Sequence, residues 1–307
     1  KLGMVIFAIS MLTNTFLNWV FIFGNLGAPA LGVEGAALAT LLSRTVEFVI
    51  MVTYALTNAR FRLKPALLLR PGSALLQKFV RYSGPVVLNE TLWGLGNSLY
   101  KVVMGHMEGS TEILAARALA GNMEDLCTVA IFAISGTTTI IIGREIGAGR
   151  REQVYEMGAA LNTMAMGCGL VIGLVLIGGA WWIFPGLVYP FFHLSSVSGG
   201  ITTMMLTFTG VFLPLRAFNT VNTVGVLRGG GDVRAATVID LLPLWLVALP
   251  LAAIFGLGVK WGIFWVYVGI MMESTTKFFL GVPRFRSRAW INDVTQFSHV
   301  KEGEPSL

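Results

Sequence analysis

The chain has 307 residues, of which 55% are hydrophobic and only 12% are charged, and its formal net charge at pH 7 is +6. Soluble domains carry about twice that charged fraction, so the composition excludes an ordinary water-soluble globule and indicates a protein built for lipid. The two cysteines, Cys127 and Cys168, lie in long apolar stretches without CxxC spacing. We therefore interpret them as small interior residues rather than as metal ligands.

Eight stretches of the chain are long and apolar enough to cross a membrane. A helix needs roughly 20 apolar residues to span a hydrocarbon core of about 30 Å. In chain order, the predicted spans are 2–23, 32–57, 77–104, 112–142, 153–183, 198–226, 235–256 and 261–281. The fold class that follows is an all-α polytopic membrane protein, whose main partner is the lipid bilayer.

Lysine and arginine are concentrated in every second loop between these spans. Basic residues gather at 58–81, 144–151 and 228–234 and in the tail 284–301, whereas the intervening loops carry only Lys260. Because cytoplasmic loops hold the excess of basic residues, this pattern predicts that Lys1 and the C-terminus are cytoplasmic in a plasma or inner membrane. The pattern also explains the positive net charge without a nucleic-acid partner.

The first two predicted spans resemble the last two at one fixed offset along the chain. The matched positions are Asn14 with Asp240, Trp19 with Trp245, Leu31-Gly32-Val33 with Leu257-Gly258-Val259, and Glu47 with Glu273. Repeats of this kind are typical of transporters built from two similar halves. If the halves are equivalent, about four further helices, or roughly 150 residues, precede Lys1, and this chain is N-terminally truncated.

Five stretches of the sequence resemble segments of multidrug and toxic compound extrusion (MATE) transporters, and they occur in the family's order. They are Phe21 through Leu31-Gly32-Val33 to Arg44, Gly84 to Trp93, Gly143 to Gly149, Gly225 to Asp232, and Arg284 to Trp290. The resemblance covers nearly the whole chain and is closest to bacterial members of the family.

The resemblance implies a MATE-like two-lobe helical bundle of twelve helices. This chain would hold the last two helices of the N-terminal lobe (1–58), a cytoplasmic linker (59–76), the complete six-helix C-terminal lobe (77–283) and a cytoplasmic tail (284–307). The family also implies export of small organic, often cationic compounds in exchange for H+ or Na+, with no cofactor. We expect the complete protein to be monomeric.

Three carboxylates lie deep in two adjacent predicted spans. Glu90 is about eleven residues, or roughly 16 Å, from the cytoplasmic end of its span, and Glu124 and Asp125 lie at a similar depth in the next one. Charges at this depth are costly, and a bound proton or sodium ion would relieve their repulsion. In the family, an acid at the position of Glu90 serves cation coupling, so the resemblance assigns that role to Glu90. The depth argument adds Glu124 and Asp125 to the same site.

An alternative for Glu90 is a structural acid that is hydrogen-bonded to Asn89 or Asn97. Some branches of the family carry a second acid in the tenth helix, where this chain has Arg216 instead. That difference puts a two-acid sodium site in doubt. Pro85, five residues before Glu90, can kink the helix and free backbone carbonyls near the site.

Four residues are candidates for the substrate path or a gate: Asn89, Trp93, Arg216 and Asp240. Arg216 and Asp240 lie toward the cytoplasmic ends of neighbouring spans and are predicted to form an ion pair. Trp93 could line an apolar pocket, although packing is the more common role of such a side chain in a bundle.

Two further pairs have the spacing of ion pairs within one helix. Arg44 and Glu47 are three residues apart, and Glu273 and Lys277 are four apart. Side chains at these spacings lie on the same helix face, so both pairs are predicted to be structural.

Three other functions remain as alternatives to an antiporter. A flippase for lipid-linked precursors needs a basic cavity between lobes, for which Arg44 and Arg216 are thin support. An intramembrane transferase needs a cluster of catalytic residues, and the sequence has no HExxH, GxSxG or Walker motif. A membrane scaffold without transport activity has no reason to keep acids near the midplane. The sequence therefore predicts a secondary transporter that is not an enzyme and has no metal site.

Overall fold

The computed structural model describes residues 2–57 and 73–292, and both stretches are helical apart from short turns. The chain divides into two compact units, residues 1–78 and 79–307. Most of the predicted linker 59–76, and the tail beyond Asn292, lie outside the described residues.

The first unit is a pair of packed helices, α1 (Leu2–Phe23) and α2 (Val33–Thr57), joined through a short 3₁₀ turn, η1 (Asn25–Gly27). The helices approach closely at Gly35, where an added Cβ would lie 2.4 Å from the carbonyl oxygen of Phe21. Polar side chains also join the two helices: the Asn14 amide donates to the hydroxyls of Thr40 and Ser43. Small residues and hydrogen bonds between helices are the usual means of helix association in lipid.

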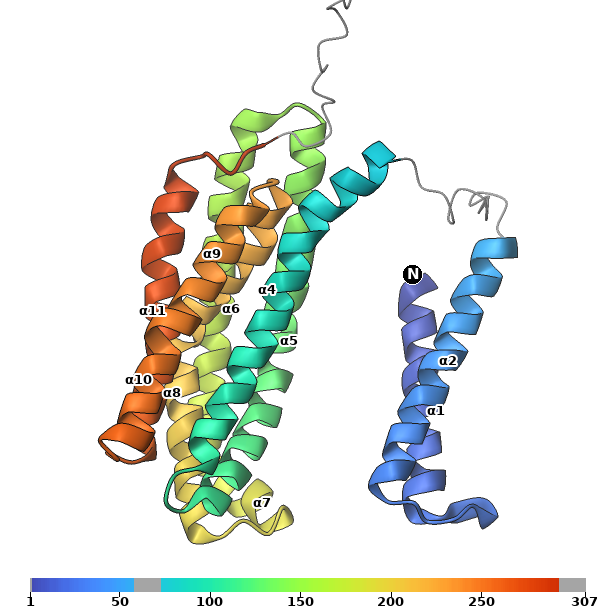
Figure 1. The fold of residues 1–307 in the computed structure, drawn as a ribbon, viewed down its shortest axis with the longest axis vertical. Helices are drawn as coiled ribbons and strands as arrows, with labels where there is room; N and C mark the ends of the chain where they lie inside the picture. The colour runs from blue at the N-terminus through green and yellow to red at the C-terminus, as the bar shows by residue number, and fades with distance from the viewer. Residues whose placement is uncertain (1, 58–72, 293–307) are drawn as a thin grey trace, which may run out of the picture. The chain divides into compact units, whose positions relative to one another are not determined.

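The second unit contains the remaining helices; the long ones run roughly along a common direction, and the short α7 lies across one end of them (Figure 1). In chain order they are α4 (Ser73–Gly105), α5 (Ser110–Gly147), α6 (Arg151–Gly178), α7 (Phe184–Phe191), α8 (Ser196–Thr220), α9 (Val233–Pro243), α10 (Leu249–Ala253) and α11 (Ile263–Arg286). Four π-helical segments extend or join them: η2 (Gly179–Ile183), η3 (Val221–Leu227), η4 (Leu244–Ala248) and η5 (Ile254–Gly258).

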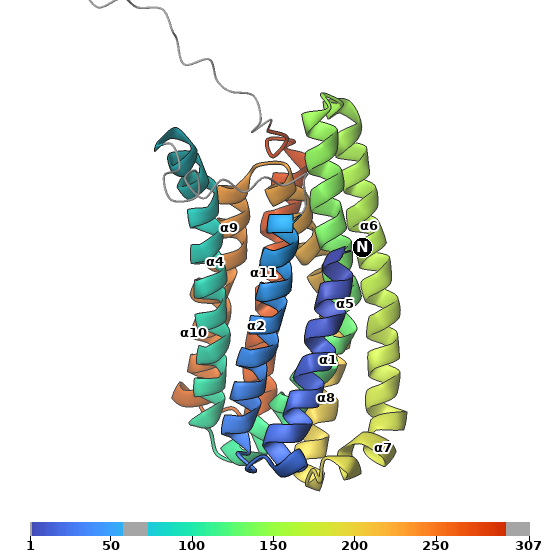
Figure 2. The same ribbon diagram turned by 90° about the vertical axis from the view of Figure 1, so that its right-hand side faces the viewer.

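Helix α8 is central to this unit because it packs against α5, α6 and α11. Its inward residues Met205, Leu206 and Leu213 are fully buried. The contact with α6 is the closest: a Cβ at Gly173 would lie 2.3 Å from the carbonyl oxygen of Gly210. Helix α4 lies on the side of α9 and α10 (Figure 2), and its Gly96 faces the side chain of Leu244 in η4.

Six of the described helical segments are long and apolar enough to cross a membrane. They cover six of the eight predicted spans. The predicted spans 77–104 and 261–281 correspond to α4 and α11, which are helical but carry more charge. The fold is therefore an all-helical membrane bundle in the described residues, and the count of eight spans remains a prediction.

Candidate functional site

Glu90 extends from α4 and is the most accessible acid of the site, with 57% of its side chain exposed. Its Oε1 accepts a hydrogen bond of 3.0 Å from Nη1 of Arg228, which follows directly after η3. The Arg228 side chain is only 12% exposed. Glu90 thus has a basic partner from a segment 138 residues away in the sequence, which the sequence analysis missed.

Glu124 is buried in α5 and is held by two arginines. Arg117 lies on the same helix, with its Nη1 3.4 Å from Oε2 of Glu124, and Arg216 reaches across from α8 to the other oxygen. The predicted pair between Arg216 and Asp240 is therefore wrong. Helices α5 and α8 pack directly on each other, so Arg216 meets Glu124, whereas Asp240 meets residues of α4 and α11.

Asp125 follows Glu124 on α5 but is exposed. Consecutive residues of a helix point about 100° apart, so the two carboxylates cannot share one face. Within residues 2–57 and 73–292, no group of three His, Cys, Asp or Glu side chains is placed to hold a metal ion. The structure thus separates the three acids Glu90, Glu124 and Asp125 that the sequence analysis placed in one cavity.

Asp240 joins three other helical segments from its position on α9. Its Oδ1 lies 2.6 Å from Nζ of Lys277 on α11, and its Oδ2 accepts a hydrogen bond of 2.9 Å from the Asn89 amide on α4. Nη2 of Arg228 lies 3.9 Å from the same Oδ2. Asp240 therefore connects the pair of Glu90 and Arg228 to the interior of the bundle.

Lys277 also pairs with Glu273 one turn earlier on α11, at 2.8 Å, as the four-residue spacing predicts. The other oxygen of Glu273 accepts a hydrogen bond of 2.9 Å from the hydroxyl of Tyr100 on α4. These contacts form one series, which we call the ion-pair chain: Glu90, Arg228, Asp240, Lys277 and Glu273.

The predicted pair Arg44 and Glu47 is also present in the first unit, at 2.6 Å.

The ion-pair chain and the Glu124 cluster are balanced in charge. Together they hold the acids Glu90, Glu124, Asp240 and Glu273 and the bases Arg117, Arg216, Arg228 and Lys277. Buried charges are tolerable when each has a partner, and removing one partner leaves the other uncompensated. The expected site of repelling carboxylates is thus replaced by acids that each touch a base.

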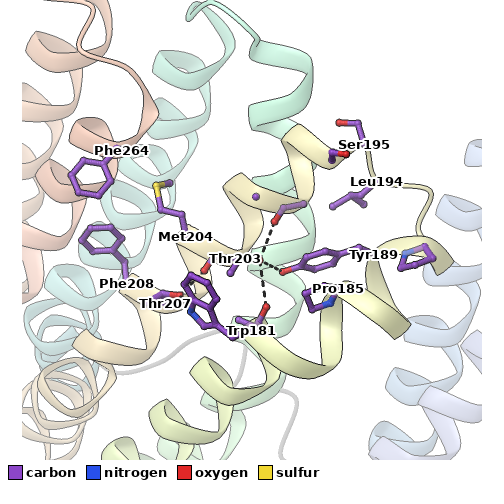
Figure 3. Close-up of a pocket in the computed structure, with 15 residues that line it drawn as sticks. Trp181, Pro185, Tyr189, Leu194, Ser195, Thr203, Met204, Thr207, Phe208 and Phe264 are labelled. Atoms are coloured by element: carbon purple, nitrogen blue, oxygen red, sulfur yellow. Dashed lines mark hydrogen bonds between the residues drawn. The ribbon is translucent and has the colours of Figure 1, made fainter.

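A separate pocket of about 870 Å³ lies where η2, α7 and α8 meet the start of α11 (Figure 3). Aromatic rings of Trp181, Phe208 and Phe264 line one part of it. Hydroxyls line another part, where Tyr189 and Thr203 are hydrogen-bonded at 2.9 Å. No Lys, Arg, Asp or Glu lines the pocket, and Trp93 is not among its lining residues. The pocket suits an uncharged group and is lined by none of the residues of the ion-pair chain.

The sequence and the fold were compared with those of known proteins. Residues 85–254, more than half of the chain, match the MatE family model. The uncharacterized transporter YisQ of Bacillus subtilis is 25% identical over 89% of the chain and 58% of its own length. A probable multidrug resistance protein NorM of Thermotoga maritima is 23% identical over 94% of the chain and 60% of its own length.

Solved structures of other proteins share this fold. A crystal structure of MATE in complex with MaL6 superimposes with a TM-score of 0.76 at 21% identity, over 93% of this chain and 62% of that one. An inward-facing MATE family transporter of the MOP superfamily gives 0.71 at 21% identity, over 93% and 64%. The chain thus spans about 60% of the length of the proteins it matches. On the match to the family model, the chain belongs to the MatE family.

Proposed function

We propose that this protein is a secondary antiporter that exports organic, cationic compounds in exchange for an inward-moving cation, across a plasma or inner membrane with its C-terminus in the cytoplasm. One observation carries the proposal: an exposed acid, Glu90, is tied through Arg228 to a series of buried ion pairs. Charges inside a membrane bundle most often mark the path of an ion or substrate.

The ion-pair chain would transmit the binding of a cation at Glu90 to the contacts between helices in the interior of the bundle. A proton on Glu90 removes the negative charge that holds Arg228, so the charge-assisted hydrogen bond between them weakens. Arg228 can then turn toward Asp240, whose oxygen is already 3.9 Å from its Nη2. That move competes with Lys277 for the same carboxylate. Protonation at the exposed end would in this way loosen contacts between α9 and α11 in the interior.

The contacts favour H+ over Na+ as the coupling ion. A sodium ion binds several oxygen atoms, but the oxygens of Glu90 and Asp240 already face the side chains of Arg228 and Lys277. Sodium would have to displace these bases, whereas a proton needs only one carboxylate oxygen. An organic cation could replace Arg228 beside Glu90, which gives substrate and proton a shared acid.

Ethidium efflux from cells that express the protein tests this proposal. Glu90→Gln keeps the shape of the side chain but not its charge, and efflux should fall by about tenfold or more. Asp125→Asn is the matched control, because Asp125 is an exposed acid of the neighbouring helix, and this variant should retain most of the wild-type rate. Undiminished efflux in Glu90→Gln would remove Glu90 from the coupling mechanism.

The flippase alternative is not favoured by the described residues. Arg44 is paired with Glu47, and Arg216 is paired with Glu124. Each guanidinium group therefore already contacts a carboxylate, which would compete with a pyrophosphate group for it.

A further inference from the structure

The segment after α11 turns back onto the bundle and buries a tryptophan. Trp290 is 0% exposed, and its indole N–H donates a hydrogen bond of 2.9 Å to the carbonyl of Phe285. Two residues later, the amide of Asn292 donates to the carbonyl of Gly230, also at 2.9 Å. A buried tryptophan that satisfies its polar atom is a strong anchor for a terminal segment.

The anchor fits closely against the glycine-rich turn that follows η3. A Cβ at Gly230 would lie 2.4 Å from the carbonyl oxygen of Trp290 and 2.5 Å from its ring, so the tail leaves no room for a side chain there. On the same turn, Oδ2 of Asp232 accepts a hydrogen bond of 2.6 Å from Nε of Arg284. Two motifs that are far apart in the sequence, Gly225 to Asp232 and Arg284 to Trp290, therefore meet.

A stack of rings extends the anchor to α6. Phe285 lies between Trp290 and Tyr155, with ring centroids 5.7 Å and 5.0 Å away. The guanidinium of Arg288 covers the Tyr155 ring at 4.3 Å. Aromatic stacks and cation–π contacts of this kind add stability beyond the area they bury. We call the set Arg284, Phe285, Trp290 and Asn292 the latch.

The turn that the latch holds follows directly on the helical end that carries Arg228. The amide of Gly231 donates to the carbonyl of Arg228 at 3.1 Å, and the amide of Asp232 donates to Leu227 at 2.9 Å. Arg228 reaches from this helical end to Glu90 on α4. Glycine allows the backbone of the turn many conformations, and the contacts of the latch add to the hydrogen bonds that the turn makes with the end of η3.

We propose that Trp290 is a positioning residue for Arg228: it fixes the turn that directly follows the helical end carrying Arg228, and so sets how firmly Arg228 is held against Glu90. This inference rests on the proposed role of Glu90 and Arg228 in coupling. Its physical claim, that burial of Trp290 and the pair of Arg228 with Glu90 are energetically coupled, is independent of any transport activity.

A double-mutant cycle on the purified protein tests the physical claim. Thermal unfolding is measured for Trp290→Ala, Glu90→Gln and the double variant. The loss of Tm in the double variant should be smaller than the sum of the two single losses, because Trp290→Ala already loosens the contact that Glu90→Gln removes. Trp182→Ala is the control, since Trp182 is 83% exposed and lies in η2, outside the latch and the turn; its loss should add to that of Glu90→Gln. Additive losses with Trp290→Ala would overturn the proposal.

Two milder variants cover the case in which Trp290→Ala does not fold. Trp290→Phe keeps a stacked ring and should behave like the wild type in the cycle. Asn292→Pro removes the backbone donor to Gly230 and should show the same coupling to Glu90→Gln. Hydrogen exchange at residues 229–232 should rise in Asn292→Pro and stay near wild type in Trp290→Phe. Unchanged exchange in Asn292→Pro would contradict the latch.

Efflux measurements distinguish a failure of the positioning role of Trp290 from a failure of the proposed transport function. In cells, Trp290→Ala should change the pH dependence of efflux in the same direction as Arg228→Ala, and the double variant should show no larger change. A lower efflux with an unchanged pH profile would mean that Trp290 is structural only, and would overturn the positioning role. If the wild type shows no cation-driven efflux, the proposed function fails, and the unfolding cycle still decides the role of Trp290.

Discussion

Asp240 shows how single residues hold this bundle together. Its carboxylate contacts Lys277 and Asn89 and lies near Arg228, so it joins α4, α9 and α11 and the end of η3. The Asn89 amide that the sequence analysis considered as a partner of Glu90 donates to Asp240 instead. An acid with partners on three other segments is structural as well as a candidate for function.

We predict that Asp240→Asn destabilises the protein strongly. The substitution removes one of the two carboxylates that offset Lys277, which is only 10% exposed. Because Glu273 remains, the loss should fall below the roughly 3–5 kcal/mol that breaking a buried pair on one side costs in soluble proteins. Thermal unfolding in detergent measures the effect. Asp125→Asn, at an exposed acid, should change the free energy of unfolding by no more than about 0.5 kcal/mol. Equal stability of the two variants would contradict the assignment of the ion-pair chain.

The ion pairs also show which contacts a sequence can predict. Arg44 with Glu47 and Glu273 with Lys277 lie on one helix each, so their spacing is enough to place them on a common face. The contact of Glu90 with Arg228 joins residues 138 positions apart. It depends on how α4 and the end of η3 are rotated in the bundle, and helix packing decides this rather than local spacing.

At the level of elements, the contact between α6 and α8 depends on glycine. Gly169 and Gly173 are four residues apart on α6, and a Cβ at either would lie within 3.0 Å of α8 backbone or side-chain atoms. Such small-residue stripes let two helices in lipid approach closely.

We therefore predict that Gly173→Ala lowers the Tm clearly, because its Cβ would press against the carbonyl of Gly210 at 2.3 Å. Gly167→Ala is the matched control on the same helix, since nothing lies within 4 Å of a Cβ there; it should be neutral or slightly stabilising, as alanine favours helix. The prediction is wrong if the two variants unfold at the same temperature.

Helices α4 and α11 could be located from sequence, although they are less apolar than the others. The sequence analysis predicted spans at 77–104 and 261–281, and the structure has helices there. Their charged residues, such as Glu90, Glu273 and Lys277, form the ion-pair chain. The π-helical segment η3, which places Arg228 next to the turn, has no signal in the sequence because glycine and β-branched residues are common throughout these helices.

For the whole molecule, the predicted topology follows from the distribution of basic residues. Residue 150, between α5 and α6, is expected on the cytoplasmic side, and residue 195, between α7 and α8, on the outer side. Cysteines at these positions, in a protein whose Cys127 and Cys168 are replaced by alanine, should react differently with a membrane-impermeant maleimide. On intact cells only Ser195→Cys should be labelled. Labelling of Arg150→Cys alone would contradict the predicted topology and indicate the opposite orientation in the membrane.

The family and the helical architecture could be predicted from motifs spread along the chain, such as Gly84 to Trp93, since these mark turns and helix ends that belong together. The partners that reach a buried charge from another helix could not. The sequence analysis took Glu90 and Glu124 as uncompensated, whereas Arg228 reaches Glu90 from the end of η3 and Arg216 reaches Glu124 from α8.

The central claim is that Glu90, held by Arg228, couples proton binding to export. The most direct measurement is ethidium transport in proteoliposomes that contain the purified protein, driven by an imposed pH gradient and, separately, by a sodium gradient. We predict transport driven by the pH gradient in the wild type and in Asp125→Asn, with a loss of about tenfold or more in Glu90→Gln. Transport by Glu90→Gln at the wild-type rate, or transport that responds only to sodium, would contradict the account.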